Sequence, residues 1–149
     1  MQPIMRRVSV TSACASLLIG AACQAATPTC KNPLGDWKNQ LNSTLSIDNY
    51  DAGTGHISGN YISPSGGGTS KFPLVGWLNS LAPQGNKNNA TIISFSVRWG
   101  SIGSVTSWTG TCVEAGGSAR LTTLWQLGRP NSDFAWDHVL TGSDAFTPQ

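Results

Sequence analysis

The sequence predicts an all-β protein, and more narrowly an eight-stranded antiparallel up-and-down β-barrel, from three observations. Charged residues make up only 11% of the chain while glycine reaches 17 residues, a composition typical of extracellular β proteins. Apolar and polar residues alternate with period two between turn signals, as in short strands joined by hairpins. Eight such strands must bury one face and hide two edges, and closing into a barrel does both. A β-sandwich is the alternative.

The chain of 149 residues is long enough for one domain with one core. Its start has the features of a secretory signal peptide: Arg6 and Arg7 come first, followed by the apolar run "ACASLLIGAA" and the small residues of "CQAA". The apolar run is shorter than the roughly 20 residues of a membrane span, so no membrane anchor is expected. We therefore expect residues 1–26 to be the signal peptide and residues 27–149 to form the secreted domain, extracellular or periplasmic.

Loss of this segment would change the charge and the cysteine content of the chain. Without its two arginines, seven basic residues face seven acidic ones, and no basic stripe remains that would favour nucleic acid as a partner. Cys30 and Cys112 are the cysteines of the remaining sequence. In an oxidising compartment one disulfide between them is the simplest account, and two free buried thiols are the alternative.

Eight segments carry the strand pattern, and turn-forming residues separate them. The expected strands lie near Gly35–Gln40, Thr44–Asp48, His56–Ile62, Phe72–Asn79, Ile92–Arg98, Ser104–Cys112, Arg120–Gln126 and Val139–Phe146. The connections "NYDAGTG", "SPSGGGTS", "APQGNKNN", "EAGGS" and "GRPNS" are rich in residues that tolerate a tight or left-handed backbone. No helix of normal length is evident.

The faces that these strands would turn inward mix large rings with polar groups. They read Trp37, Asn39, Leu41, Ser43 on the first strand; Ile57, Gly59, Tyr61, Ser63 on the third; Phe95, Val97, Trp99 on the fifth; Ser104, Thr106, Trp108, Gly110, Cys112 on the sixth; and Thr123, Trp125, Leu127 on the seventh. Buried hydroxyls and amides need partners, so a ligand cavity explains the mixture better than an ordinary core with polar ends. An eight-stranded barrel has room for one small ligand.

Seven motifs then follow one another in an order and spacing that resemble a known family. They are "GDWKNQLNST", "GNYIS", "PLVGW", "FSVRW", "WTGTC", "LTTLWQL" and "WDHVLTGSDAF", and together they extend from about Cys30 to Phe146. The chain resembles the avidin and streptavidin family. The resemblance implies a secreted eight-stranded barrel that binds biotin tightly and non-covalently, with no enzymatic activity and no cofactor.

The resemblance also implies a role for individual residues. Asn39, Ser43 and Tyr61 would donate hydrogen bonds to the ureido oxygen of biotin, while Ser63 and Asp144 would accept from its N–H groups. Thr106 would approach the thioether sulfur, Trp99, Trp108 and Trp125 would wall the bicyclic ring, and Leu127 would lie beside Trp125. Ser104 and the backbone of "SPSGGG", which includes Gly66 and Gly67, would meet the carboxylate, and Leu41 is also placed among the ligand-binding residues. Free N–H groups of a glycine turn can hold an anion in this way.

The stretch "AWDHVLTGSDAF" places Trp136 eight residues before Asp144. Eight extended residues span about 26 Å, so one straight strand cannot bring both side chains to one small ligand. Either the chain folds back between them, or Trp136 covers the site of a neighbouring subunit. The family resemblance implies the second arrangement, in a homotetramer favoured over a dimer.

Other functions have weaker support from the sequence. His56 and His138 are the two histidines, and the chain contains neither a G-x-S-x-G nor an H-E-x-x-H motif nor Cys/His spacing for a metal. An enzyme is therefore not expected. A secreted small-barrel protease inhibitor and a carrier of another small apolar ligand remain the alternatives. Trp37 is expected to fill a barrel end, whereas the pattern assigns no role to Trp77 or Ile102.

Overall fold

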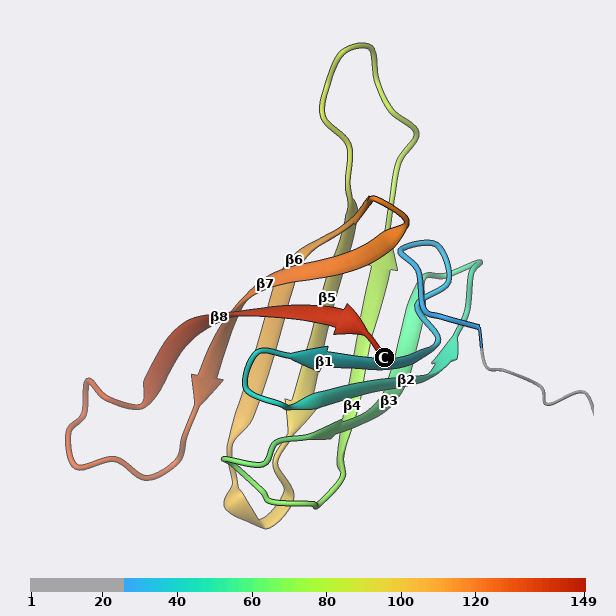
Figure 1. Cartoon of the computed structure of the whole chain (residues 1–149). Helices are drawn as coiled ribbons and strands as arrows, with labels where there is room; N and C mark the ends of the chain where they lie inside the picture. The colour runs from blue at the N-terminus through green and yellow to red at the C-terminus, as the bar shows by residue number, and fades with distance from the viewer. Residues whose placement is uncertain (1–25) are drawn as a thin grey trace, which may run out of the picture.

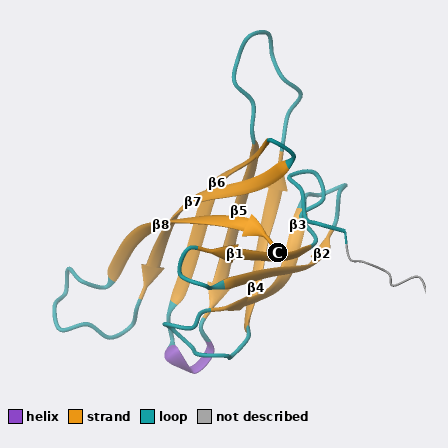
Figure 2. Cartoon of the chain, in the orientation of Figure 1, coloured by secondary structure: helices purple, strands orange, loops and turns teal. Residues whose placement is uncertain are grey.

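A computed structural model describes residues 26–149 as a closed barrel of eight antiparallel strands, each paired with its neighbours in the sequence (Figure 1). The strands are β1 (Gly35–Asn39), β2 (Thr44–Tyr50), β3 (His56–Ile62), β4 (Phe72–Asn79), β5 (Thr91–Arg98), β6 (Val105–Ala115), β7 (Ser118–Gly128) and β8 (Val139–Pro148). The short 3-10 helix η1 (Gly100–Ile102) lies between β5 and β6 (Figure 2). The predicted fold class is confirmed.

The expected signal peptide, residues 1–26, lies outside the described residues except for its last position. Within the part of the chain that the structure describes, no helix is both long enough and apolar enough to cross a membrane.

Strands β6 and β7 are longer than the sequence pattern indicated. Their pairing continues from Val105 and Gly128 to Ala115 and Ser118, directly beside the connection. The two connecting residues are glycines with φ of 61° and 81°. A two-residue turn with both φ angles positive matches the twist of paired strands, so the ladder continues up to the turn and "EAGGS" contributes residues to both strands.

Pairing of β1 with β8 closes the barrel, with Asn39 opposite Phe146 and Trp37 opposite Pro148. Closure leaves none of the eight described strands with a free edge, and it brings β1 against β8. Because inward-facing residues alternate along each strand, Asn39 and Asp144 both point into the barrel and are buried.

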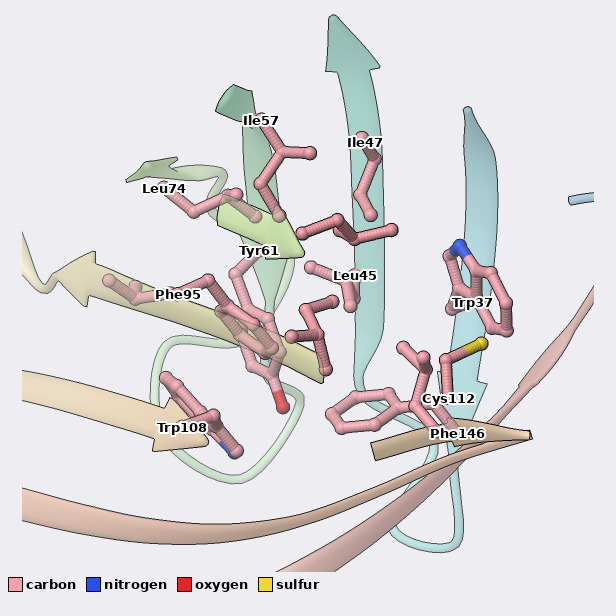
Figure 3. Packing of buried hydrophobic residues seen from close by; sticks show 14 of the residues in the cluster. Trp37, Leu45, Ile47, Ile57, Tyr61, Leu74, Phe95, Trp108, Cys112 and Phe146 are labelled. Atoms are coloured by element: carbon pink, nitrogen blue, oxygen red, sulfur yellow. The ribbon is translucent and has the colours of Figure 1, made fainter. Parts of the chain in front are cut away.

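One half of the barrel interior is filled by an apolar core, part of which is drawn in Figure 3. Fully or nearly fully buried are Leu45, Ile47, Ile57, Leu74, Ile93, Phe95, Val97, Leu121 and Phe146. Trp37 belongs to this half: its ring is inaccessible to solvent and its Nε1 donates to the Pro33 carbonyl at 2.9 Å. Trp37 therefore fills the barrel as expected and is not part of a ligand cavity.

A disulfide joins Cys30 to Cys112, as the sequence predicted. Both cysteines are buried, and the bond ties the segment before β1 to the inward face of β6. The Cys30 amide also donates to the Glu114 carboxylate at 3.0 Å. The N-terminal segment is thus fixed across the end of the barrel that holds the core.

Candidate functional site

The other half of the barrel contains a cavity of about 270 Å³. Residues of the β1–β2, β3–β4 and β5–β6 connections line it, and these connections lie at the same end of the barrel (Figure 1). Thirteen of its lining residues were expected in the site: Asn39, Leu41, Ser43, Tyr61, Ser63, Gly66, Trp99, Ser104, Thr106, Trp108, Trp125, Leu127 and Asp144. Ser65 and Ile102 line it as well.

Asp144 is the only charged residue among those that line the cavity, and its side chain is 5% exposed. Its Oδ1 accepts hydrogen bonds from Asn39 Nδ2 and Gln40 Nε2, both at 3.0 Å, and its Oδ2 accepts from Trp108 Nε1 at 2.9 Å. A carboxylate offers about four lone pairs, so Oδ2 retains capacity for one further donor. Charge-assisted hydrogen bonds are the strong ones, and these three fix the carboxylate in place.

Asn39 organises the hairpin between β1 and β2 around its own side chain. Its Oδ1 accepts from the backbone N–H groups of Leu41 at 3.0 Å and Ser43 at 2.8 Å. One of the two Nδ2 protons goes to Asp144, and because an amide nitrogen carries two protons, the second can be donated to a ligand. The same contacts place Ser43 in the cavity and Leu41, which is largely exposed, at its rim.

Tyr61 brings a buried phenol into the cavity from the end of β3. Burial raises the pKa of the Tyr61 hydroxyl well above its ordinary value; a hydrogen bond with Ser43 opposes this rise, and the negative charge of Asp144 adds to it. Tyr61 therefore stays protonated at neutral and moderately alkaline pH, so that its hydroxyl remains a neutral hydrogen-bond donor.

Two of the three tryptophans in the wall are held by their indole nitrogens. Trp99 Nε1 donates to Thr106 Oγ1 at 2.7 Å, which leaves the Thr106 proton free to point elsewhere. Trp108 donates to Asp144 and stacks on Phe95, with ring centroids 4.9 Å apart and planes at 10°. Trp108 therefore lies at the boundary between the two halves of the barrel, where it lines the cavity and packs against the core.

Ser65 and Ile102 are the two lining residues whose side chains the sequence did not assign to the site, and both lie in connections and not in strands. The Ser65 hydroxyl is 3.3 Å from that of Ser63. Ile102 ends η1, where Gly100 and Gly103 adopt φ of 55° and 81° and turn the chain tightly. The glycines on either side of Ile102 were the available signal, but they indicate a turn without saying which side chain faces the cavity.

The backbone of Gly66 and Gly67, which was expected to meet the carboxylate, is engaged in a turn of the β3–β4 connection. The Gly66 and Gly67 amides already donate to the Ser63 carbonyl, at 3.2 and 2.9 Å, inside a turn. Gly67 does not line the cavity; a Cβ there would lie 2.7 Å from Cζ of Phe72. Glycine is accommodated at this position because Phe72 packs against the backbone, so the role of Gly67 in the structure is packing.

Trp136 and Trp77 both lie outside the cavity of their own chain. Trp136 is 78% exposed in the connection between β7 and β8, where its ring stacks on Phe134 with centroids 5.3 Å apart. The base of this connection is closed by an ion pair between Arg129 and Asp137. Trp77 projects from the outer face of β4 beside His56, with ring centroids 5.8 Å apart and ring planes at 73°.

The chemistry of the lining is that of a binding site. Donor and acceptor groups converge on one end of a space walled by large rings, which suits a small ligand that is polar at one end and apolar elsewhere. Among residues 26–149 no three His, Cys, Asp or Glu side chains gather where they could hold a metal ion.

Comparison with known proteins gives one consistent result. The sequence model described as the Avidin family matches residues 27–149. Avidin of Gallus gallus is 29% identical over 119 residues, which are 76% of this chain and 75% of that protein. Afifavidin of Afifella pfennigii is 34% identical over 121 residues, 74% of this chain and 65% of that protein. The crystal structure of core-bradavidin superposes with a TM-score of 0.62 at 32% identity, covering 76% of this chain and 97% of that one.

Proposed function

The chain belongs to the avidin family, and from this premise we propose that it binds biotin in the barrel cavity without changing it chemically. The observation that carries the proposal is the Asp144 carboxylate, which is buried at the polar end of the cavity and held by three donors. A buried charge of this kind needs full hydrogen bonding, and a ureido N–H would use the capacity that Oδ2 retains. Ser63 would accept from the second N–H group.

The donors of the cavity suit the ureido oxygen. Asn39 retains one Nδ2 proton, and Tyr61 and Ser43 each bring a hydroxyl to the cavity. Several fixed donors around one oxygen favour its charge-separated form, as in an oxyanion hole used for binding alone. Since these groups are fixed before the ligand arrives, little side-chain order has to be gained on binding.

The remaining lining suits the rest of the molecule. Thr106 has a free proton for the thioether sulfur, and the walls formed by Trp99, Trp108 and Trp125 would cover the bicyclic ring. At the mouth, Ser104 and Ser65 would meet the carboxylate. They replace the glycine backbone as its donors, because the Gly66 and Gly67 amides are engaged within their own turn.

Biotin titration tests the proposal. Micromolar biotin is expected to quench tryptophan fluorescence, because three rings wall the cavity, and to raise Tm, because the ligand binds only the folded chain. Lipoic acid is the matched control, since it also has a five-membered sulfur-containing ring with a valerate chain but lacks the ureido group. Equal responses to both compounds would favour a carrier of apolar acids, and no response to either would end the proposal.

We extend the proposal to secretion and assembly. Residues 1–26 would direct export, and the domain of residues 27–149 would act outside the cytoplasm as a homotetramer, in which Trp136 of one subunit covers the cavity of another. Two features support this role for Trp136: its ring is exposed, and its stacking on Phe134 and the Arg129–Asp137 ion pair hold it away from its own cavity.

The Trp136→Ala variant is expected to bind biotin about 30-fold more weakly, because a buried tryptophan at an interface contributes about 2 kcal/mol. The dissociation constant of the subunit assembly should also rise, so that sedimentation detects dissociated subunits at protein concentrations where the wild type remains assembled. Leu81→Ala is the matched control, since Leu81 is 70% exposed in the β4–β5 connection at the far end of the barrel. A Trp136→Ala protein that keeps both properties would make this ring an ordinary surface aromatic.

A further inference from the structure

Trp125 differs from the other two tryptophans of the wall in how it is held. Trp99 and Trp108 each donate their indole N–H to a buried oxygen, and each pairs with another ring. Within residues 26–149 neither kind of contact fixes Trp125, which is half-buried and packs against the apolar cluster. Something other than a hydrogen bond must therefore determine where its ring lies.

Gly142 is the residue directly opposite Trp125 in the ladder between β7 and β8. Position 142 faces inward, two residues before Asp144 on the same strand. A Cβ built on Gly142 would lie 2.6 Å from Cε2 of Trp125 and 3.0 Å from its Cη2, with Cζ2 closer still. The benzene part of the indole thus lies flat against the backbone of β8, in space that any other side chain would fill.

The two observations together explain the position of the third wall. Because Gly142 has no side chain, the Trp125 indole can pack against the backbone of β8. The ring therefore lies at the side of the cavity and does not project into the lumen. A methyl group at position 142 would clash with atoms of the six-membered ring. Because the indole is rigid, these atoms cannot move individually, and the whole ring would have to tilt. Forcing an extra carbon into a packed interior displaces side chains in this way.

We propose that Gly142 is a positioning residue for ligand binding: it sets the place of the Trp125 ring and thereby the width of the cavity. The inference rests on the proposed function for its ligand, whereas the packing of Gly142 against Trp125 stands independently of it. Gly142 does not contact the ligand and acts only through the Trp125 ring opposite.

The test is a double-mutant cycle between the two positions. Gly142→Ala is expected to weaken biotin binding about tenfold or more, because the displaced ring narrows the lumen. Trp125→Ala also weakens binding, but adding Gly142→Ala to it should cause no further loss, since the methyl group then has space. Gly128→Ala is the matched control: it lies at the end of β7, and its Cβ would come no closer than 3.8 Å to another atom, the Val105 carbonyl oxygen.

Near-ultraviolet circular dichroism of the ligand-free proteins separates this proposal from the proposed function. Gly142→Ala should change the tryptophan signal of the otherwise wild-type chain and leave that of Trp125→Ala unchanged. If Gly142→Ala alone fails to fold, recovery of the fold by Trp125→Ala would support the proposal. An equal loss of affinity in both backgrounds, an unchanged affinity, or an unchanged tryptophan signal would overturn it, even if biotin binding itself is established.

Discussion

The Asp144→Ala variant is expected to lose about 3 kcal/mol of biotin affinity, more than a hundredfold in Kd, because it removes a charged acceptor and leaves a buried ligand N–H unpaired. The loss extends to the protein, since Asn39, Gln40 and Trp108 all donate to this carboxylate. Without this acceptor, the hydrogen bonds that orient these three side chains around the ligand are lost. Calorimetric or kinetic measurement of biotin affinity checks the expectation.

Two further variants make this result specific. Asp144→Asn keeps the shape, but its NH₂ group would face one of the three donors, so an intermediate loss is expected. Asp48→Ala removes an exposed carboxylate that accepts from Asn60 at 2.8 Å on the outside of the barrel, and it should leave the affinity unchanged. A folded Asp144→Ala protein with wild-type affinity would remove Asp144 from the site.

Loss of the Cys30–Cys112 disulfide is expected to be the largest effect on stability. The bond closes a loop across 82 positions of sequence, and in the chain-entropy model a loop of this size contributes about 4.5 kcal/mol by restricting the unfolded chain. The Cys30→Ser/Cys112→Ser double variant should therefore unfold roughly 10–20 °C below the wild type. Scanning calorimetry of the variant measures the difference.

A chemical control accompanies the double variant. Wild-type protein treated with a reductant under denaturing conditions and refolded in its presence should converge on the Tm of the variant. Biotin binding should persist in both at low temperature, because the disulfide lies at the core end of the barrel and not in the cavity. An unchanged Tm without the disulfide would contradict its assigned contribution to folding.

Side-chain alternation was sufficient to locate the strands, because every strand of a filled barrel buries one face and exposes the other. Alternation alone could not distinguish a closed barrel from a β-sandwich. Asn39 and Asp144 lie 105 positions apart in sequence, and they meet because β1 pairs with β8. A sandwich built from the same strands would not require that pairing, so the contact between these two residues follows from the family resemblance and from the closed topology.

The site was least predictable where the chain leaves its strands. Ser65 and Ile102 lie in connections, where alternation no longer says which side a residue faces. Gly67 was assigned to the site because glycine backbones can bind anions, but the Ser63 carbonyl accepts its N–H within the turn. The contact between Gly142 and Trp125 was also beyond the sequence, since it depends on the exact cross-strand register.

The two halves of the barrel depend on each other through shared side chains. Trp108 stacks on Phe95 in the core and donates to Asp144 in the cavity, and Tyr61 lies 5.1 Å from Trp108 between ring centroids. A ligand that fills the cavity would therefore restrain rings that also belong to the core. This coupling is a physical reason to expect a stabilised barrel when the cavity is occupied.

Equilibrium dialysis of the purified, refolded domain, residues 27–149, against labelled biotin measures directly whether the barrel binds this ligand. We expect saturable binding of one biotin per chain, which excess unlabelled biotin displaces and lipoic acid does not. The Asp144→Ala variant should bind biotin more than a hundredfold more weakly. If a protein that unfolds cooperatively shows no saturable binding at micromolar biotin, the barrel cavity is not a biotin site.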